Sequence, residues 1–341
     1  MEWTVAIGVD THKDTHMAVA LDHVGVQVAS CEVPARRAGY LELVRFAQEL
    51  GEPAFAIEGA GSYGAGLASL LVACGFRVYE VERPRRNERR RGKSDLIDAA
   101  AAAGRLLAGE GLSALRGGGQ EREDLRVLLV ERRGAVRAET AARNQLQALL
   151  VTAPSELRER LGRLSGETLV RRCRRLRPRG EHEQVLVSVL RRLAARVQAL
   201  ARELAELDQE LEGIVSALVP ELLDECGVGP ICAAQLVVSS GDPTRMKNEG
   251  SFAALAGTSP VEASSGPLRR HRLNRGGDRQ LNWALYVIAR ARIRFHGETR
   301  AYYERLLARG KTSREALRCI KRMLARLFYR LLVHNPALTL A

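Results

Sequence analysis

Four carboxylate side chains in the N-terminal third of the chain have the spacing of a phosphoryl-transfer site. Asp10 and Glu58 each directly follow a short apolar run that reads as a β-strand, and Asp95 and Asp98 lie three residues apart in a helical segment. Residues three apart share one face of a helix, and clustered carboxylates repel one another unless cations bind between them. Two Mg²⁺ ions roughly 3.5–4 Å apart would hold the attacking and leaving oxygens of an in-line displacement at phosphorus.

Each acid taken alone also has a purely structural interpretation. Asp10 could cap a turn, and Asp95 could be an anion that the dipole favours at a helix N-terminus. Their joint placement on the right elements is what favours a catalytic site over these alternatives. We expect the neighbouring residues Asp14, His12 and His16 to be surface residues rather than metal ligands.

The apolar pattern predicts the elements that must position these acids. Short apolar runs between turn residues indicate strands, and segments with helical periodicity lie between them. The expected strands are residues 4–9, 17–21, 24–33, 54–57 and 76–81, and the expected helices are residues 40–50, 63–74 and 94–107. The order β-β-β-α-β-α-β-α predicts an α/β domain of the ribonuclease H-like fold over residues 1–108. In that fold the acid-bearing strand ends are neighbours and the last helix packs across them.

The middle of the chain is expected to be helical. Residues 109–120 hold five glycines and form the expected linker. A helix without internal proline follows over residues 121–151, and then a polar stretch that contains Pro154 and Pro178. Further on, apolar residues recur in alternating steps of four and three, at Leu186, Leu190, Leu193, Val197, Leu200, Leu204, Leu207, Leu211, Ile214 and Leu218.

Such a heptad repeat predicts a coiled-coil seam that must face another helix. The partner is either the helix over residues 121–151, folded back as a hairpin, or a second subunit. A seam of this length favours a dimer or tetramer, although both arrangements satisfy the pattern. The helical and coiled-coil region is expected to span residues 121–220 and to end at Pro220.

The last part of the chain, residues 221–341, is predicted to form a mainly helical domain. Helices are expected around residues 251–255, 279–294 and 301–332, with a stretch rich in glycine and arginine over residues 264–278. Gly227 and Gly229 stand between two expected helices, as in helix-hairpin-helix elements whose backbone amides bind a phosphate. An ordinary tight turn explains this pair of glycines equally well.

The charge distribution predicts a polyanionic partner. The formal net charge is +13, and 48 of the 53 basic residues are arginine. Residues 265–330 alone carry 18 basic and 4 acidic residues, so one segment accounts for the whole imbalance. Such a surface attracts nucleic acid because each neutralised phosphate releases counterions, and arginine binds phosphate with a planar fork. A GC-rich genome would explain the preference for arginine over lysine, but it does not explain the clustering.

Other features of the sequence exclude several classes of protein. The longest apolar runs are shorter than the eighteen or so residues of a membrane span, and the first residues do not resemble a signal peptide. The six cysteines are scattered without C-x-x-C spacing, which disfavours a disulfide framework or a structural zinc site. We therefore expect a soluble protein of the cytoplasm without a membrane partner.

Motifs spread over nearly the whole chain resemble one family. The N-terminal motifs are Asp10-Thr-His-Lys, Ile57-Glu-Gly-Ala-Gly-Ser-Tyr63 and Lys93-Ser-Asp-Leu-Ile-Asp-Ala99. The C-terminal motifs are Gly227-Val-Gly229, Phe252-Ala-Ala-Leu-Ala-Gly-Thr-Ser-Pro260, Ser264-Ser-Gly266 and Arg275-Gly-Gly-Asp278. In order and spacing they resemble the DEDD-type insertion-sequence transposases. This is insertion sequence family 110 with its sister group, described as bridge-RNA-guided recombinases.

The resemblance implies a RuvC-like N-terminal domain, joined by a coiled coil to a domain that holds a nucleophilic serine. By motif position that serine is Ser265. The resemblance implies that Ser265 attacks a DNA phosphate to give a covalent phosphoserine, with Mg²⁺ held by Asp10, Glu58, Asp95 and Asp98. A serine hydroxyl is a weak nucleophile, so activation by a nearby metal ion makes chemical sense.

The implied partners are donor and target DNA, a structured bridge RNA and further copies of the chain. A protein that leaves sequence recognition to base pairing needs many arginines for the backbone and few side chains that read bases. Three basic tracks, residues 83–93, 171–179 and 269–279, could contact DNA or RNA. The individual candidates are Arg85, Arg86, Arg89, Arg90, Lys93, Arg269, Arg270, Arg272 and Arg275, together with Gly227 and Gly229.

Two other functions are compatible with these residues. A structure-selective nuclease of the Holliday-junction type would use the four carboxylates and a water molecule, without Ser265. A coiled-coil protein with a decayed active site would bind nucleic acid without catalysis, although all four carboxylate positions are intact.

Overall fold

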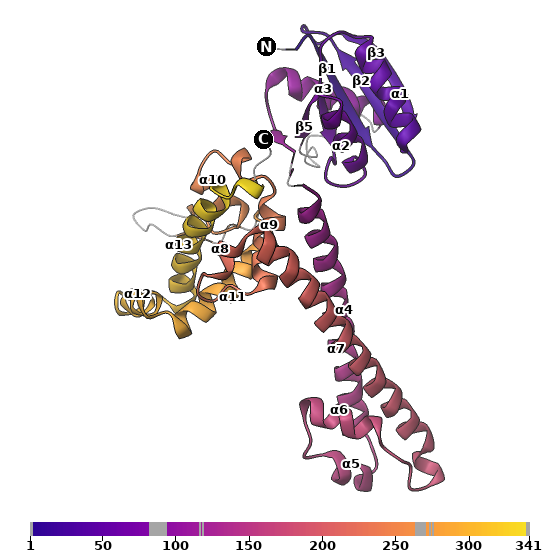
Figure 1. Cartoon of the computed structure of the whole chain (residues 1–341), viewed down its shortest axis with the longest axis vertical. Coiled ribbons are helices and arrows are strands. Elements are labelled where there is room, and N and C mark those ends of the chain that lie inside the picture. The colour runs from indigo at the N-terminus through magenta and orange to yellow at the C-terminus, as the bar shows by residue number, and fades with distance from the viewer. Residues whose placement is uncertain are drawn as a thin grey trace. The chain divides into compact units, whose positions relative to one another are not determined.

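The structure, a computed structural model of the 341-residue chain, describes residues 3–81, 94–115, 117, 119–262, 271–272, 274 and 276–338. The chain divides into two compact units, Met1–Gly117 and Gly118–Ala341 (Figure 1). Each unit has its own hydrophobic clusters, so we describe each separately.

The first unit is built on a mixed sheet of six strands. Its strands are β1 (Val5–Thr11), β2 (Thr15–Leu21), β3 (Gln27–Pro34), β4 (Pro53–Glu58), β5 (Arg77–Val81) and β6 (Leu112–Ala114), in the order β3-β2-β1-β4-β5-β6. Strands β1, β2 and β3 form the expected antiparallel meander, and β4 and β5 continue the sheet parallel to β1. This topology fits a ribonuclease H-like domain.

Helices cover both faces of this sheet, and the strand residues sort by size between the two faces. The larger side chains of Ile7, Val9, Phe55 and Ile57 belong to the cluster that α1 (Arg37–Gln48) and α2 (Ala65–Ala73) complete. The alternate positions of β1 and β4 hold small residues and face α3 (Asp95–Ala108); they are Ala6, Gly8, Ala54 and Ala56. Small residues on one face let α3 approach the sheet closely.

The closest approach is at Gly8, in the middle of β1. A Cβ atom at Gly8 would overlap the carbonyl oxygen of Ala99 and the amide nitrogen of Ala103, both in the backbone of α3. Ala99 and Ala103 are fully buried at this contact. The absence of a side chain at Gly8 therefore sets the distance between α3 and β1.

The expected linker contains an additional strand. Gly109 ends α3 in the left-handed conformation, and Leu112–Ala114 then pairs antiparallel with β5 as β6. The glycines of residues 109–120 indicate turns correctly, but a three-residue edge strand is too short to give a recognisable alternation of its own.

The second unit contains two long helices that lie side by side and antiparallel (Figure 1). They are α4 (Gly119–Val151) and α7 (Gln184–Leu218). At one end they pack with α5 (Ser155–Leu161) and α6 (Gly166–Arg174) in a separate hydrophobic cluster. These two short helices occupy the stretch expected to be only polar, because Leu157, Leu161, Leu169, Val170 and Cys173 give each of them a buried face.

The heptad residues of α7 face α4 in the same chain, most closely near the two ends of the pair. Leu190, Leu193 and Val197 are buried at one end, and Leu207 and Leu211 are buried toward the other. Beside Leu207, Arg132 Nε donates to Asp208 Oδ1 across the pair at 2.5 Å. The hairpin alternative for the seam is thus present in the single chain, and Leu200 and Leu204 are only half-buried in it.

The other end of the α4–α7 pair joins a helical domain around the largest hydrophobic cluster. Its helices are α8 (Pro220–Leu223), α9 (Pro230–Ser240), α10 (Glu249–Leu255), α11 (Arg279–Phe295), α12 (Gly297–Ala308) and α13 (Ser313–Val333). A two-stranded sheet of β7 (Val261–Glu262) and β8 (His271–Arg272) lies between α10 and α11 in the sequence. Single turns of 3₁₀ helix occur at Glu181–Glu183, Pro243–Arg245 and Pro336–Leu338. Among the described helices, none has both the length and the apolar character needed to cross a bilayer.

The contact at Gly8 gives a testable prediction. Gly8→Ala should lower the free energy of unfolding of the first unit by about 1–3 kcal/mol, the usual effect of overpacking a tight core. The added methyl group would push α3 away from β1. Gly104→Ala is the matched control, because Gly104 lies in α3 with no heavy atom near the position of an added Cβ. We expect the control to raise stability by up to about 1 kcal/mol through helix propensity. Urea unfolding measures both, and equal effects of the two substitutions would contradict the close approach.

Candidate active site

The strand alternation places two of the four predicted acids on the same side of the sheet. Asp10 continues the α3-facing positions of β1, and Glu58 continues those of β4. Asp10 and Glu58 are direct Cα partners in the parallel register of the two strands. The Thr11 hydroxyl donates a 2.7 Å hydrogen bond to the carbonyl oxygen of Glu58, which ties the two strand ends together.

The other two acids lie in the first turn of α3, which packs across these strands. Ser94 is the N-cap of this helix, and its side chain accepts a hydrogen bond from the amide of Ile97 at 3.3 Å. Asp95 is exposed and Asp98 is half-buried, and both act electrostatically on Asp10. The first unit thus collects Asp10, Glu58, Asp95 and Asp98 at one edge of the sheet.

An imidazole that the sequence argument placed on the surface belongs to this cluster. His12 Nε2 lies 3.1 Å from Asp10 Oδ2 and 3.3 Å from Asp95 Oδ1. Because side chains alternate along a strand, His12 shares the face of Asp10, and this periodicity is the signal that could have identified it. The His12 side chain is 44% exposed, so it lies at the surface as expected, whereas the expectation for His16 was wrong, since His16 is fully buried and stacks on Tyr40. Asp14 is exposed as expected.

The electrostatics of the cluster centre on Asp10, which is only 7% exposed. Burial raises the pKa of Asp10 above its ordinary value, and the Asp98 and Asp95 carboxylates raise it further. His12 opposes the increase in this pKa through its charge and its hydrogen bond. The fold therefore holds Asp10 where its ionised form is disfavoured unless a positive charge accompanies it.

The donor atoms suit a divalent cation. One oxygen of Asp10, one oxygen of Asp95 and a ring nitrogen of His12 all lie within 4.8 Å of one another. Carboxylate oxygens are the ligands that Mg²⁺ prefers, and an imidazole nitrogen is accepted by several transition metals. Glu58 and Asp98 add further carboxylates at the same edge of the sheet. A cation there would relieve the repulsion that raises the pKa of Asp10.

The predicted nucleophile, Ser265, lies outside the described residues, but the segments that flank it are well defined. Strands β7 and β8 pair antiparallel, with Val261 opposite Arg272 and Glu262 opposite His271. Before β7, the Thr258 hydroxyl donates to the carbonyl oxygen of Ala253. After β8, the Asp278 amide donates to the carbonyl oxygen of Leu255 at 2.6 Å. Both flanks are thus attached to α10.

A second close approach of backbone supports these flanks. A Cβ atom at Gly277 would overlap the backbone of Gly257, so the two segments pack without side chains between them. Asp278 is the N-cap of α11 and also accepts a hydrogen bond from the Ser239 hydroxyl of α9 at 3.0 Å. The Asn282 amide donates to the carbonyl oxygen of Ala256 at 2.7 Å. These contacts fix the two ends of the segment that contains Ser265.

Comparisons with known proteins agree with this arrangement. Residues 7–153 match the DEDD transposase family of IS110, and residues 221–304 match the transposase IS116/IS110/IS902 family. The chain is 27% identical to the insertion element IS900 uncharacterized 42 kDa protein of Mycobacterium paratuberculosis, over the whole of both chains. It is 27% identical to the insertion element IS116 uncharacterized 44.8 kDa protein of Streptomyces clavuligerus, over 93% of this chain and 91% of that one. It is also 30% identical to a probable family 20 transposase of Pseudomonas aeruginosa, over 47% of each chain.

The chain belongs to the IS116/IS110/IS902 family of transposases. As a transposase it is a DNA-processing enzyme, and membership of the DEDD group implies that it uses divalent metal ions. The two matching segments include all four carboxylates of the cluster and the segment that contains Ser265.

The two glycines singled out in the transposase occupy different environments. Gly227 has a left-handed φ of 83°, and a Cβ there would lie 2.9 Å from the Cβ of Ala291 in α11. Gly229 is exposed at the N-cap of α9. Packing against α11 explains why Gly227 is glycine, whereas the neighbours of Gly229 offer no free amide, because Pro230 has no N–H and the Val228 amide donates to the carbonyl oxygen of Glu225.

The basic tracks of the transposase lie mostly outside the described residues. This holds for Arg85, Arg86, Arg89, Arg90, Lys93, Arg269, Arg270 and Arg275, whereas Arg272 is described only through the backbone pairing of β8. The track over residues 171–179 is described. There Cys173 and Leu176 are buried while the six arginines between residues 171 and 179 are exposed. This track is therefore free to contact a polyanion.

The cation site predicts that the effect of Asp10→Asn on the free energy of unfolding has opposite signs with and without metal. In metal-free protein, Asp10→Asn should match or exceed the wild type in stability, because the fold disfavours the ionised form of Asp10. Its advantage should grow as the pH rises from the ordinary pKa of an aspartate to the raised pKa of Asp10 and stay constant above it, because the carboxyl ionises first in the unfolded chain. With Mg²⁺ at a hundredfold excess over its Kd, the wild type should gain about 2.7 kcal/mol and the variant much less.

Thermal unfolding with and without Mg²⁺ measures these effects. The control is Asp14→Asn, at an exposed carboxylate four residues away in the sequence. It should behave as the wild type in both conditions. Equal stabilisation of the wild type and Asp10→Asn by Mg²⁺ would exclude Asp10 as a ligand.

Proposed function

We propose that this transposase cuts and rejoins DNA through a covalent phosphoserine at Ser265, with Mg²⁺ held by Asp10, Glu58, Asp95 and Asp98, and that a structured bridge RNA guides it. The observation that carries the proposal is the convergence of the four carboxylates at one edge of the sheet, in a chain that also matches the transposase family over residues 221–304. The chain's three-part division into a catalytic domain, a helical region and a C-terminal domain is part of the same proposal.

The carboxylates have distinct tasks in this proposal. Asp10 and Glu58 are fixed by the sheet and provide rigid ligands, whereas Asp95 and Asp98 come from a helix and depend on the contact at Gly8. Mg²⁺ bound to them would polarise the phosphate and lower the pKa of an attacking hydroxyl. His12 orients the Asp10 and Asp95 carboxylates in the free protein through its ring nitrogen.

The serine step exchanges one phosphoester bond for another. The Ser265 Oγ–P bond forms as the bond between phosphorus and one deoxyribose oxygen breaks. The serine proton is lost to a base, and the released deoxyribose hydroxyl takes up a proton. Because the phosphodiester energy is kept in the phosphoserine, attack by another DNA hydroxyl can reverse the step and rejoin strands. Hydrolysis by water would lose that energy.

A guide RNA is consistent with the composition of the chain. The chain holds 48 arginines, whereas aromatic residues make up only 4%, so it has many groups that contact phosphate and few that stack on bases. The exposed arginines of residues 171–179 and the tracks over residues 83–93 and 269–279 are the proposed contacts to RNA or DNA. Base pairing would then supply the sequence recognition that the protein lacks.

The seam of α7 supports a homo-oligomer, either a dimer or a tetramer. Within one chain, Leu200 and Leu204 are half-buried, and nearby on α4 the buried residues are the small Ala135 and Ala142. The middle of the pair therefore leaves apolar surface of both leucines exposed, which a second subunit would cover.

Covalent trapping tests the serine mechanism. After denaturation, DNA should stay attached to the wild type and to Ser264→Ala, and the adduct should be absent from Ser265→Ala. Ser264 is the matched control because it is the adjacent serine in the same motif. Gel electrophoresis under denaturing conditions with labelled DNA detects the adduct.

The same experiment separates the alternative functions. Normal DNA cleavage by Ser265→Ala without an adduct would favour a nuclease that uses water and the four carboxylates. Activity that is unchanged in Asp10→Ala would exclude metal-dependent catalysis and favour a nucleic-acid-binding protein.

Introducing charged residues into the seam of α7 tests whether that seam forms a contact between subunits. Leu200→Lys combined with Leu204→Lys should reduce the mass of the particle in solution, because two buried charges at a subunit contact are unfavourable. The control combines Ala199→Lys with Ala205→Lys at exposed positions of the same helix. Light scattering gives the mass and circular dichroism the helix content. A folded Leu200/Leu204 variant of unchanged mass and activity would refute the seam as a subunit contact.

A further inference from the structure

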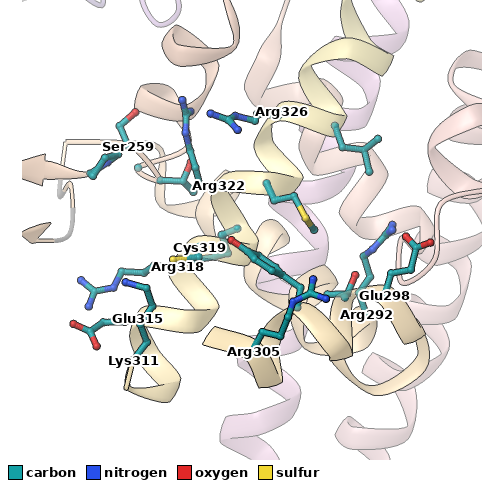
Figure 2. A pocket seen from close by; sticks show the side chains of 18 of the residues that line it. Ser259, Arg292, Glu298, Arg305, Lys311, Glu315, Arg318, Cys319, Arg322 and Arg326 are labelled. Atoms are coloured by element: carbon teal, nitrogen blue, oxygen red, sulfur yellow. The ribbon is translucent and has the colours of Figure 1, made fainter. Parts of the chain in front are cut away.

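The second unit contains a large pocket that none of the preceding roles uses. Its volume is about 1120 Å³, and it is lined by α11, α12 and α13 and by the residues that precede β7 (Figure 2). Sites that enclose a drug-sized ligand usually measure about 300–1,000 Å³. A pocket of this size therefore fits part of a larger molecule better than a small metabolite.

The lining of this pocket is strongly basic. Arg318, Arg322 and Arg326 follow one another at intervals of four on a single face of α13, and Arg305 and Lys311 lie nearby (Figure 2). Like charges at this spacing destabilise a helix. Arg326 has a counterion in Glu249 at 2.9 Å. Among the described residues, no carboxylate lies within ion-pair distance of Arg305, Lys311, Arg318 or Arg322.

The acidic residues of the lining do not neutralise this charge. Glu315 forms a capping box with Thr312 at the start of α13, where its Oε2 accepts hydrogen bonds from the amide and the hydroxyl of Thr312. Those hydrogen bonds lower the pKa of Glu315, and Arg318 and Lys311 lower it further. Glu298 is the second acidic residue of the lining. Of the seven basic side chains in the lining, Arg292 is paired with Glu225 and Arg326 with Glu249, so two lining carboxylates stand against five further cations.

A buried ammonium group gives independent evidence for an anionic ligand. Lys321 lines the pocket, is only 7% exposed, and donates a 2.8 Å hydrogen bond to the neutral Oδ1 of Asn282. Burial lowers the pKa of Lys321, and Arg318 lowers it further. No carboxylate of the described chain pairs with Lys321. A buried cation without a counterion is costly, so an anion in the pocket would remove an energetic defect of the free protein.

The position of the pocket connects it with the serine segment. Thr258, Ser259 and Pro260 line it immediately before β7, and Asn274 lines it after β8. These residues flank the segment that contains Ser265. A ligand in the pocket therefore lies against the two attachment points of that segment.

The chemistry of the lining selects the kind of anion. Arginine forks bind phosphate oxygens in two-point contacts, and such contacts position a nucleic acid without reading its bases. Tyr302 is the one phenol or indole ring among the lining residues, and the Arg305 guanidinium lies over it at 5.9 Å from its centroid. Arg305 thus lies at one face of this ring, and the lining offers far fewer groups that stack on bases than groups that bind phosphate.

We propose that this pocket, the α13 pocket, binds successive phosphates in the backbone of a nucleic-acid strand. The proposal rests on the proposed function for the presence of a nucleic-acid strand, but it does not depend on covalent chemistry. DNA and RNA share the phosphodiester backbone, and the experiments below distinguish them.

Salt-dependent binding tests the proposal with the full chain and labelled DNA and RNA strands of 20 nucleotides. Each lost phosphate contact should make the slope of log K against log salt less steep by about 0.7 for a single strand. Arg318→Gln combined with Arg322→Gln should therefore change the slope by about 1.4, for whichever nucleic acid the pocket holds. Lys321→Met should weaken binding while keeping the fold, because it removes a buried charge.

The matched control is Arg191→Gln combined with Arg192→Gln, which removes the same charge from exposed positions of α7. It should leave the slope unchanged. If Arg322→Gln disturbs its hydrogen bond to the Glu249 carbonyl and the double variant unfolds, Arg305→Gln with Arg318→Gln replaces it. Equal slopes in the pocket variants and the control would overturn the proposal, as would equally strong competition by polyglutamate.

Cys319 provides a second test because its thiol lines the pocket. Bound nucleic acid at tenfold excess over its Kd should slow alkylation of Cys319 by N-ethylmaleimide about elevenfold. The exposed Cys74 of the first unit is the internal control and should react at its former rate. Burial raises the pKa of Cys31, Cys173 and Cys232 to about 11, so these thiols should contribute little.

Peptide mass spectrometry measures the alkylation of each cysteine. The experiment is run on the wild type and on Ser265→Ala, so that failure of the serine mechanism leaves the result unaffected. Protection by DNA or by RNA supports the proposal and identifies the strand. Equal alkylation of Cys319 with and without either nucleic acid, in protein that binds them, would overturn it.

Discussion

The packing of α3 onto β1 across Gly8 is the contact on which the candidate active site depends. It brings the first turn of a helix that begins 85 residues after Asp10 to the end of the strand that holds Asp10. The contact uses the smallest residues available, with Gly8 on the strand and Ala99 and Ala103 on the helix, so few other sequences could reproduce it. Hydrophobic burial of this face opposes the repulsion among the carboxylates. The fold thus imposes an electrostatic cost that a bound cation removes.

In the second unit, close packing of backbone at glycines again positions a candidate functional segment. Gly257 and Gly277 bring two backbone segments together, and Asp278 and Asn282 add hydrogen bonds that fix both flanks of the serine segment. Of these two side chains, only Asn282 also accepts a hydrogen bond from a cation of α13, the buried Lys321. The candidate active site of the first unit thus collects carboxylates, and the pocket of the second unit collects cationic side chains. Phosphoryl transfer needs cations at the reacting group and a positive surface along the rest of the nucleic acid.

The sequence predicted what depends on local periodicity and missed what depends on tertiary contact. Asp10 and Glu58 could be placed because apolar alternation locates strand ends, and Asp98 because helical spacing relates it to Asp95. Strand alternation could have placed His12 on the face of Asp10, whereas its contact with Asp95 follows only from the packing of α3. The helices α5 and α6 were missed since their buried faces are shorter than three turns. The lack of a counterion at Lys321 depends on all the elements around it, and no window of sequence contains that information.

The two charged sites also make ligand binding part of the stability of each unit. In the first unit, burial raises the pKa of Asp10, so the carboxylate is held in a less favourable environment than in the unfolded chain. In the second unit, burial lowers the pKa of Lys321, so the charged ammonium group is likewise held in a less favourable environment than in the unfolded chain. A ligand that binds only the folded state offsets such a cost by an amount that rises with the logarithm of its concentration above the Kd. Divalent cations would therefore stabilise the first unit and a polyanion the second, which makes each unit most stable when the substrates of the reaction are present.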